Sequence, residues 1–339
     1  MPNTFFKINF NVFFLLFLLY HCCRGGAGRE VSNIKKQNGS VPVPEVFVAM
    51  EGNRKVTENL MTPEEIEKIV KSLEIINEKM EPPRPGDWLW VHSEPGQSFT
   101  EYRSSHQFLL NSRRRIIYIQ PLGSFTEGQK KIMERTADFM ERFFGIEVKI
   151  KKALSLENIP SSAKRVHPEW GDKQINSGYI LNKILIPLVS DDAVGLLGFT
   201  ATDLWPGEGW NFVFGEASLS DRVGVWSIYR KGNADGSPAE FRLVLRRTLQ
   251  TAVHEMGHML GMLHCKKWKC VMNGSNSLEE SDRRPLSLCP ECLAKVLWVT
   301  GTNPVARFEK LKEFYKNEGM EKELNYVKKA LEIVSENRK

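Results

Sequence analysis

The chain has 339 residues, which is long enough to bury a sizeable core in one or two domains. Its 41% hydrophobic and 26% charged residues are ordinary for a soluble globular protein. The net charge of +6 is small, and positive and negative residues are interspersed without a compact basic run that contains aromatic side chains. The composition therefore argues against a nucleic-acid-binding protein.

Residues 1–29 have the layout of a secretory signal peptide. Lys7 precedes an apolar run over residues 12–20, and small residues follow at 25–28. The run is too short to span a bilayer, so no stable transmembrane anchor is predicted. The alternative is an extended amino terminus without a targeting role. Because four of the six cysteines belong to a metal-type motif, few remain for disulfides, which favours a reducing compartment and leaves the localisation open.

Residues 30–112 are predicted to form an N-terminal extension with one helix. The run T-P-E-E at 62–65 places threonine at the N-cap, proline in the first turn and glutamate where it closes a capping box. An apolar stripe continues from Ile66 to Ile76, and the proline-rich stretch 82–86 marks a boundary. The aromatic and histidine residues between 87 and 106 could line a pocket, but we expect them mainly to pack.

Residues 113–300 alternate between strand and helix patterns. We predict strands at 116–121, 146–154, 193–202, 211–216 and 223–229, and helices at 125–144, 177–188, 241–260 and 293–299. This order predicts an α+β fold with a mixed twisted sheet and helices packed on it. Residues 231–240 are predicted to be a mobile loop. Residues 301–339 contain two helical stretches with few apolar positions, so we predict a C-terminal helical extension on the surface.

The most informative stretch is H-E-x-x-H-x-x-G-x-x-H, which runs from His254 to His264. On a helix, His254 and His258 project from one face and present two nitrogen ligands to one metal ion. Gly261 permits a turn that brings His264 back as a third ligand. Three histidines leave one tetrahedral position for water, as a catalytic zinc requires, and Glu255 is placed to act on that water. The alternative is a buried helix with solvated histidines.

A second metal-type motif follows directly. It has the form C-x4-C, then eighteen residues, then C-P-E-C, and it consists of Cys265, Cys270, Cys289 and Cys292. Four thiolates in this spacing suit a closed, structural zinc site. Two short disulfides or free buried thiols are the alternatives. Because Cys265 follows His264, this site would hold the loop that carries the third histidine.

The run H-E-M-G-H-M-L-G-M-L-H-C-K-K-W-K-C-V-M, followed by C-P-E-C, resembles the archaemetzincin family of zinc metallopeptidases. The stretches 203–215 and 273–286 are also similar to this family, and the resemblance covers roughly residues 84–300. It implies a zincin-like (metzincin) fold with an active-site helix. It also implies two zinc ions per chain and packing of Met272 under the catalytic metal. The alternating residues 211–216 predict an edge strand that pairs with a peptide substrate, which the resemblance supports, and an internal core strand is the alternative.

Together these observations predict a zinc metallopeptidase. Its catalytic zinc would be bound by His254, His258 and His264, with Glu255 as the general base and acid, and its structural zinc by the four cysteines. The predicted organisation is a signal-like segment at 1–29, an extension at 30–112, the peptidase domain at 113–300 and a helical extension at 301–339. The expected partner is a peptide or protein substrate. The alternatives are a non-catalytic peptide-binding module stabilised by zinc, and a hydrolase of non-peptide amides.

Overall fold

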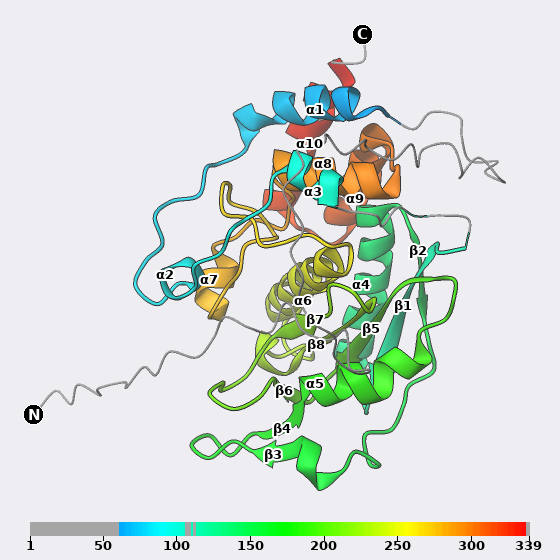
Figure 1. Cartoon of the computed structure of the whole chain (residues 1–339), viewed down its shortest axis with the longest axis vertical. Helices are drawn as coiled ribbons and strands as arrows, with labels where there is room; N and C mark the ends of the chain where they lie inside the picture. The colour runs from blue at the N-terminus through cyan, green and yellow to red at the C-terminus, as the bar shows by residue number, and fades with distance from the viewer. Residues whose placement is uncertain (1–60, 106–109, 111–112, 337–339) are drawn as a thin grey trace, which may run out of the picture. The chain divides into compact units, whose positions relative to one another are not determined.

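The computed structural model describes residues 61–105, 110 and 113–336 (Figure 1). The signal-like segment at 1–29 lies outside these residues, as does the whole stretch from 30 to 60. Within the described residues, no helix combines the length and the hydropathy that a membrane span needs. The described residues form a mixed α and β structure that begins at the first N-terminal helix.

A five-stranded sheet forms the centre of the fold, in the order β2-β1-β5-β8-β7. The strands are β1 (Ile116–Leu122), β2 (Glu147–Ile150), β5 (Ala193–Thr200), β7 (Gly215–Ala217) and β8 (Val223–Ser227). β2, β1, β5 and β8 run parallel, whereas β7 is antiparallel to β8 and lies at the edge. The predicted mixed sheet is confirmed. β5 and β8 are fully buried because both faces of the sheet are covered.

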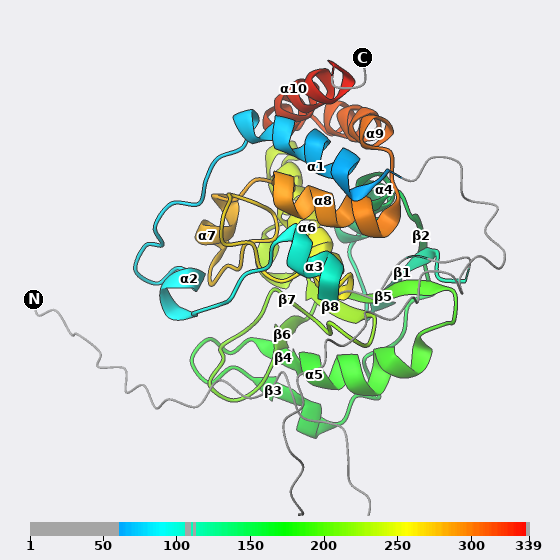
Figure 2. The same cartoon turned by 45° about the horizontal axis from the view of Figure 1, so that its top comes forward.

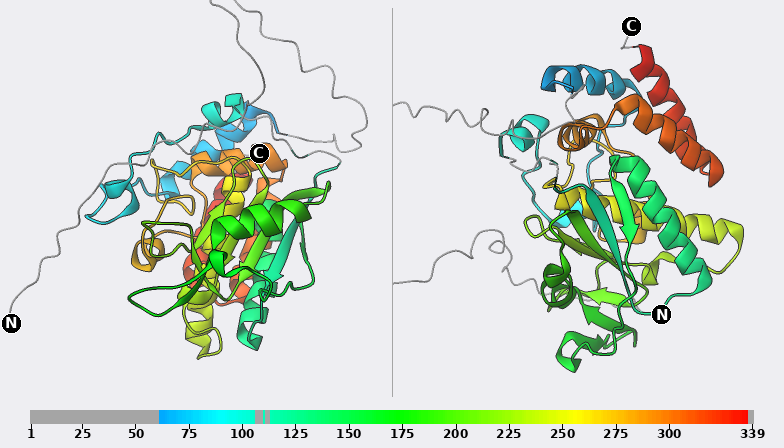
Figure 3. Two further views of the ribbon diagram at one scale, coloured as in Figure 1. Left: turned by 60° about the horizontal axis from the view of Figure 1, so that its bottom comes forward. Right: turned by 90° about the vertical axis from the view of Figure 1, so that its right-hand side faces the viewer.

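Two long helices cover one face of this sheet, α4 (Glu127–Phe144) and α6 (Pro238–Met259) (Figures 1 and 3). A capping box begins each helix, at Thr126 for α4 and at Ser237 for α6. Gly145, with φ 67°, ends α4 in the left-handed conformation. Helix α6 begins at Pro238, earlier than the predicted residue 241. Its N-cap, Ser237, and its first-turn proline lie in the stretch 231–240 that was predicted to be a mobile loop, so the end of that stretch is helical.

The other face of the sheet carries a shorter helical stretch. It consists of α5 (Ser177–Tyr179) and the turns Ile180–Leu185 and Ile186–Leu188, with Ile180 and Leu185 buried against β5 and β8. The predicted helix at 177–188 is therefore irregular rather than uniform. A second, three-stranded sheet of β3 (Lys164–Val166), β4 (Lys173–Asn176) and β6 (Asp203–Trp205) lies beside it (Figure 1).

The predicted strand at 211–216 is only partly formed. The paired strand is β7 at Gly215–Ala217, while Val213 makes an isolated bridge to Leu204. Upstream of β7, the Arg165 guanidinium donates hydrogen bonds to the backbone carbonyls of Trp210 and Asn211, each at 2.9 Å. These carbonyls are therefore not available for a strand ladder. The predicted strand at 146–154 is also shortened, to Glu147–Ile150.

The N-terminal part contains the predicted helix α1 (Pro63–Ser72), with its capping box formed between Thr62 and Glu65. A 3-10 turn (Leu73–Ile76) follows it, and then come α2 (Trp88–Val91) and α3 (Phe99–Ser105). Helices α1 and α3 both pack on α8 (Pro290–Thr300), so this part joins the same core as α4 and α6 (Figure 2).

The C-terminal helices α9 (Pro304–Asn317) and α10 (Glu321–Glu336) form a hairpin. The prediction that they lie on the surface was wrong, because each carries an apolar stripe that is buried in the main core. The buried side chains include Phe308, Leu311, Phe314, Tyr315, Leu324, Val327, Ala330 and Val334. Helix α9 packs on α4 and α10 on the turn after α1 (Figure 2). The hairpin therefore helps to build the core.

We expect Phe314→Ala to lower the free energy of unfolding by about 3–5 kcal/mol, because the substitution leaves a cavity in a packed aromatic cluster. The Phe314 side chain is buried, and its ring centroid lies 5.0 Å from that of Phe139. Urea unfolding of the metal-loaded chain measures the change. Leu243→Ala on α6 is the control, since Leu243 is 42% exposed. Similar losses in both variants would contradict the packing described for α9.

Candidate active site

The three histidines of the motif lie together at the end of α6. His254 and His258 occupy its last turns, and Gly261, with φ 80°, starts the turn that returns His264. The ligand atoms of the three side chains all lie within 4.8 Å of one another, and the ring centroids are 4.6, 5.2 and 4.9 Å apart. The arrangement that the spacing predicted is therefore present.

Each histidine is held through its Nδ1 atom. His254 Nδ1 lies 2.9 Å from the Val271 carbonyl, and His258 Nδ1 lies 2.8 Å from the Met262 carbonyl. Because a carbonyl oxygen only accepts, Nδ1 carries the hydrogen in these two rings and Nε2 keeps a lone pair. The two Nε2 atoms face each other at 3.0 Å. Two lone pairs directed at one position fit a cation between them.

The surroundings also keep these imidazoles neutral, as metal binding requires. Burial lowers the pKa of His258 to about 3 and holds the pKa of His254 well below its usual range. The neighbouring histidines act in the same direction, since a second positive charge so close would be repelled. The residues therefore fit a divalent transition metal such as zinc.

Glu255 points from α6 toward the edge strand. Its carboxyl is buried beside Gly215 of β7, where an added Cβ atom would lie 2.5 Å from Glu255 Oε1, so only glycine leaves room for this side chain. Burial raises the pKa of Glu255 to about 8, and the nearby Glu216 adds to the shift. Lys231 opposes it. A cation held by the histidines would also favour the carboxylate.

Lys231 is a buried cation that the sequence analysis missed, since it placed residue 231 in a mobile loop. Its Nζ atom donates to Thr251 Oγ1 at 2.7 Å and lies 4.1 Å from the ring centroid of Phe214. Burial lowers the pKa of Lys231 to about 7, and the charge of Glu255 opposes that shift. Glu216 was missed as well. Its carboxylate accepts a hydrogen bond from Ser177, and burial raises its pKa. No local motif marks either residue.

The four cysteines form a second, fully buried group. Their sulfur atoms lie within 4.8 Å of one another, and the Sγ atoms of Cys265 and Cys289 are 3.7 Å apart. That distance excludes a disulfide between these two, and all four cysteines are free thiols. Backbone N–H groups of Met272 and Cys289 donate to Cys270 Sγ at 3.4 and 3.3 Å. A buried tetrad supported in this way fits a closed metal site.

The loop between the two groups connects them. Its Val271 carbonyl holds His254, and the Cys265 N–H donates to the Met272 carbonyl at 2.8 Å. Met272 is buried under α6, where an added Cβ atom on Gly257 would lie 2.5 Å from its sulfur. Met272 thus packs beneath the histidines.

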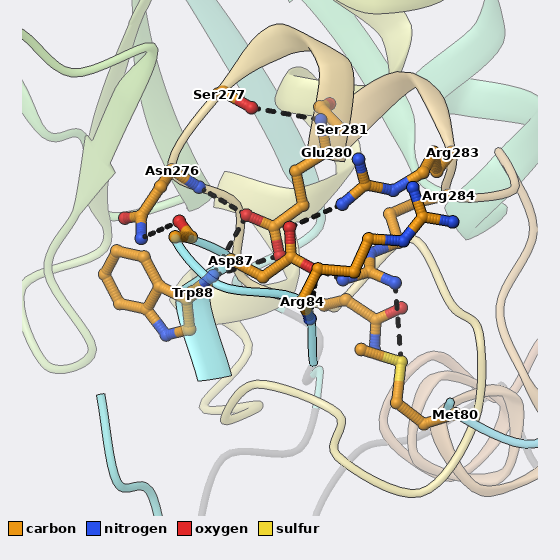
Figure 4. Close-up of polar contacts among 12 residues, drawn as sticks. Met80, Arg84, Asp87, Trp88, Asn276, Ser277, Glu280, Ser281, Arg283 and Arg284 are labelled. Atoms are coloured by element: carbon orange, nitrogen blue, oxygen red, sulfur yellow. Dashed lines mark hydrogen bonds and ion pairs between the residues drawn. The ribbon is translucent and has the colours of Figure 1, made fainter. Parts of the chain in front are cut away.

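Ion pairs stiffen the neighbouring loop (Figure 4). Glu280 of α7 (Leu278–Asp282) is buried and pairs with Arg284 at 2.9 Å. The Glu280 carboxylate also accepts the N–H of Trp88 at 3.0 Å, and Arg283 pairs with Asp87 at 2.5 Å (Figure 4). These contacts attach the start of α2 to the metal-binding region.

The first aromatic residue of α2, Trp88, lies beside the histidine triad. The Trp88 ring centroid is 5.2 Å from that of His264 and 4.1 Å from that of His92. His92 in turn stacks on Trp210 at 6.2 Å. Glu94, two residues after His92, lies 2.8 Å from His264 Nδ1 through its Oε1 atom. Sequence reasoning did not single out Glu94, since a lone glutamate in an irregular segment carries no signal.

Several known proteins are similar to this chain. The sequence pattern of Peptidase family M54 matches residues 129–297. Archaemetzincin-2 from Macaca fascicularis is 36% identical over 264 residues, which cover 67% of this chain and 71% of that protein. The archaemetzincin of Archaeoglobus fulgidus is 36% identical over 180 residues, or 53% of this chain and 98% of that protein. Its crystal structure with malonate covers 53% of this chain and 99% of its own, with a TM-score of 0.42.

The histidine triad, the cysteine tetrad and these relatives define a zinc metallopeptidase. The chain belongs to the archaemetzincins, Peptidase family M54. A peptidase acts on peptides or proteins, so its substrate belongs to that class.

Proposed function

We propose that residues 113–300 adopt a metzincin-type fold and hydrolyse peptide bonds at a zinc held by His254, His258 and His264. The observation that carries this proposal is the pair of Nε2 atoms at 3.0 Å, with the corresponding Nδ1 atoms both engaged by carbonyl groups. The third histidine lies within 4.8 Å of both. When bound, zinc polarises the scissile carbonyl and lowers the pKa of water to about 7.

Glu255 acts as general base and then as general acid. Its carboxylate takes a proton from the attacking water and passes it to the leaving amine. Burial favours the protonated form of this carboxyl, and a cation at the histidines would favour its ionised form, so both forms that the two proton transfers need are accessible. Gly215 leaves the space that this carboxyl occupies.

The edge strand β7 orients the substrate. β7 is the last strand of its sheet, so one side of its backbone has no neighbouring strand in the five-stranded order. An extended peptide that pairs with this side gains main-chain hydrogen bonds, which fix the scissile bond in register. Gly215 of β7 lies against Glu255, so a peptide on this strand passes the proposed base.

A second zinc is bound by Cys265, Cys270, Cys289 and Cys292 and is structural. The tetrad is buried and supplies four thiols, so no position is left for a substrate. Its role is to hold the loop whose carbonyl at Val271 orients His254.

We expect Glu255→Ala to keep both metals and to reduce kcat by about 10²–10⁴-fold, since general base catalysis contributes a factor of that size. Glu255→Gln tests the same proton transfer with the shape of the side chain preserved. Zinc content and cleavage of a peptide library are measured together. Glu134→Ala, on an exposed position of α4, is the control. Full activity in a metal-loaded Glu255→Ala preparation would contradict the assignment of the base.

We expect Cys292→Ser to bind one zinc per chain where the wild type binds two, with a lower thermal midpoint. The remaining hydroxyl is a poor replacement for a buried thiolate ligand. Elemental analysis gives the count. In cobalt-substituted protein, the sulfur-to-metal absorption should vanish in Cys292→Ser and persist in His258→Ala. Two bound metals in Cys292→Ser would argue against the tetrad as a site.

We expect Lys231→Met to shift the acid limb of the pH profile of kcat/KM to higher pH. Glu255 works as a base only when it is ionised, so the rate falls as the pH drops through its pKa. The positive charge of Lys231 lowers the pKa of Glu255, and its removal therefore raises that pKa. Lys328→Met, on an exposed position of α10, is the control. An unchanged limb would show that Lys231 does not affect the base.

A further inference from the structure

The third histidine depends on support from outside its own helix. α6 ends at Met259, so the backbone that follows no longer has the regular helical partners that fix His254 and His258. Residues 260–264 instead form a turn through Gly261, and His264 lies at its end. The position of this imidazole is therefore set by what contacts the turn.

The turn is contacted along its length by residues 94–102, which we call the N-terminal strap. Tyr102 Oη donates to the Leu260 carbonyl at 2.6 Å. Gln97 donates through Nε2 to the Gly261 carbonyl at 3.3 Å and accepts the Leu263 N–H at Oε1 at 3.2 Å. His264 Nδ1 lies 2.8 and 3.1 Å from the two carboxylate oxygens of Glu94. The strap therefore replaces the hydrogen bonds that the helix no longer supplies.

The strap is in turn attached to α8. Lys295, which is buried, donates through Nζ to the Gln97 carbonyl at 2.5 Å and to Gln97 Oε1 at 3.1 Å. Glu291 accepts the N–H of Phe99 at 2.5 Å. α8 begins at the cysteine tetrad, since Cys289 is its N-cap residue and Cys292 lies in its first turn. The strap is thus fixed to a rigid element.

The Glu94 carboxylate contacts two ring nitrogen atoms, one from Trp88 and one from His264. Its Oε1 atom accepts from Trp88 Nε1 at 2.9 Å and lies 2.8 Å from His264 Nδ1. A carboxylate has no hydrogen to give, so the hydrogen of this bond belongs to His264 and its Nε2 atom is left with a lone pair. Backbone carbonyls do the same for the other two histidines, but here the acceptor is a charged group, which makes a stronger hydrogen bond.

We propose that Glu94 is a positioning residue of the metal centre, which fixes the tautomer and the direction of the third ligand, His264. The N-terminal strap is then part of the peptidase centre, although it precedes the residues 129–297 that the family pattern matches. This inference rests on the proposed role of His264 as a ligand. Glu94 touches neither substrate nor metal, and it acts through the imidazole that it holds.

The test uses the full chain and three variants, Glu94→Ala, Glu94→Gln and Glu101→Gln. Glu101 lies in the same strap and is exposed, and its carboxylate accepts from the N–H and the hydroxyl of nearby Ser98, so it is the matched control. Each protein is loaded with cobalt and titrated with a competing chelator. The sulfur-to-metal absorption reports the cysteine site and the fold, while the ligand-field bands report the histidine site.

We expect Glu94→Ala to weaken metal binding at the histidine site by about 10–100-fold, which is the usual effect of losing such a partner. Glu94→Gln should lose less, because an amide oxygen accepts the same hydrogen without the charge. The ligand-field bands of cobalt at the histidine site should shift in Glu94→Gln, whereas Glu101→Gln should have the metal affinity and the bands of the wild type. The cysteine site should keep its affinity in all three variants.

Wild-type affinity and unchanged bands in both Glu94 variants would overturn the inference and leave the proposed function intact. A wild-type chain that binds no metal at the histidines would instead overturn the proposed function. If Glu94→Ala loses the sulfur-to-metal absorption, its fold has failed and Glu94→Gln decides the outcome. Partial weakening in Glu94→Gln supports the role of Glu94, and wild-type affinity refutes it.

Discussion

The centre of this molecule depends on one electrostatic constraint, the convergence of imidazole lone pairs on a single position. Two Nε2 atoms face each other at 3.0 Å, an arrangement that a cation between them would stabilise. Their Nδ1 hydrogens are directed away, into carbonyl groups from residues 262 and 271. α6 gives the first two rings their spacing, and the elements around it supply acceptors for each Nδ1 atom. The packing of α4, α8 and the C-terminal hairpin holds those elements in place.

A second constraint is the placement of charge beneath Glu255. The carboxyl lies in a region where burial disfavours ionisation, with Glu216 adding to the effect and Lys231 opposing it. Lys231 is itself buried and is held by Thr251, which precedes Glu255 by one helical turn on α6. The proton affinity of the carboxyl is therefore set by a balance of opposite charges. The zinc that the family requires would add to the positive side of that balance.

The features that the sequence predicted are those that local spacing determines. The capping box at Thr62 and the end of α4 at Gly145 depend on neighbouring residues, and the histidine and cysteine motifs have recognisable spacings within residues 254–292. Glu94 could not be found in this way because its partner is 170 positions away, and Lys231 could not because it belongs to no such motif. The strand at 211–216 was predicted too long because the alternation of residues does not reveal that the Arg165 side chain binds the Trp210 and Asn211 carbonyls. The C-terminal helices were misjudged because few of their apolar residues were counted.

The contact between Glu94 and His264 also has a consequence for how the chain matures. The two residues are separated by 170 positions, whereas the seven proposed metal ligands lie within residues 254–292. During synthesis the glutamate leaves the ribosome long before the imidazole that it orients, and the strands of the central sheet are made in between. A nascent chain can therefore gather its ligands locally, whereas the contact that orients His264 forms only when residues 94–102 meet the turn at 260–264. Assembly of the proposed metal centre is in this way coupled to a long-range step of folding.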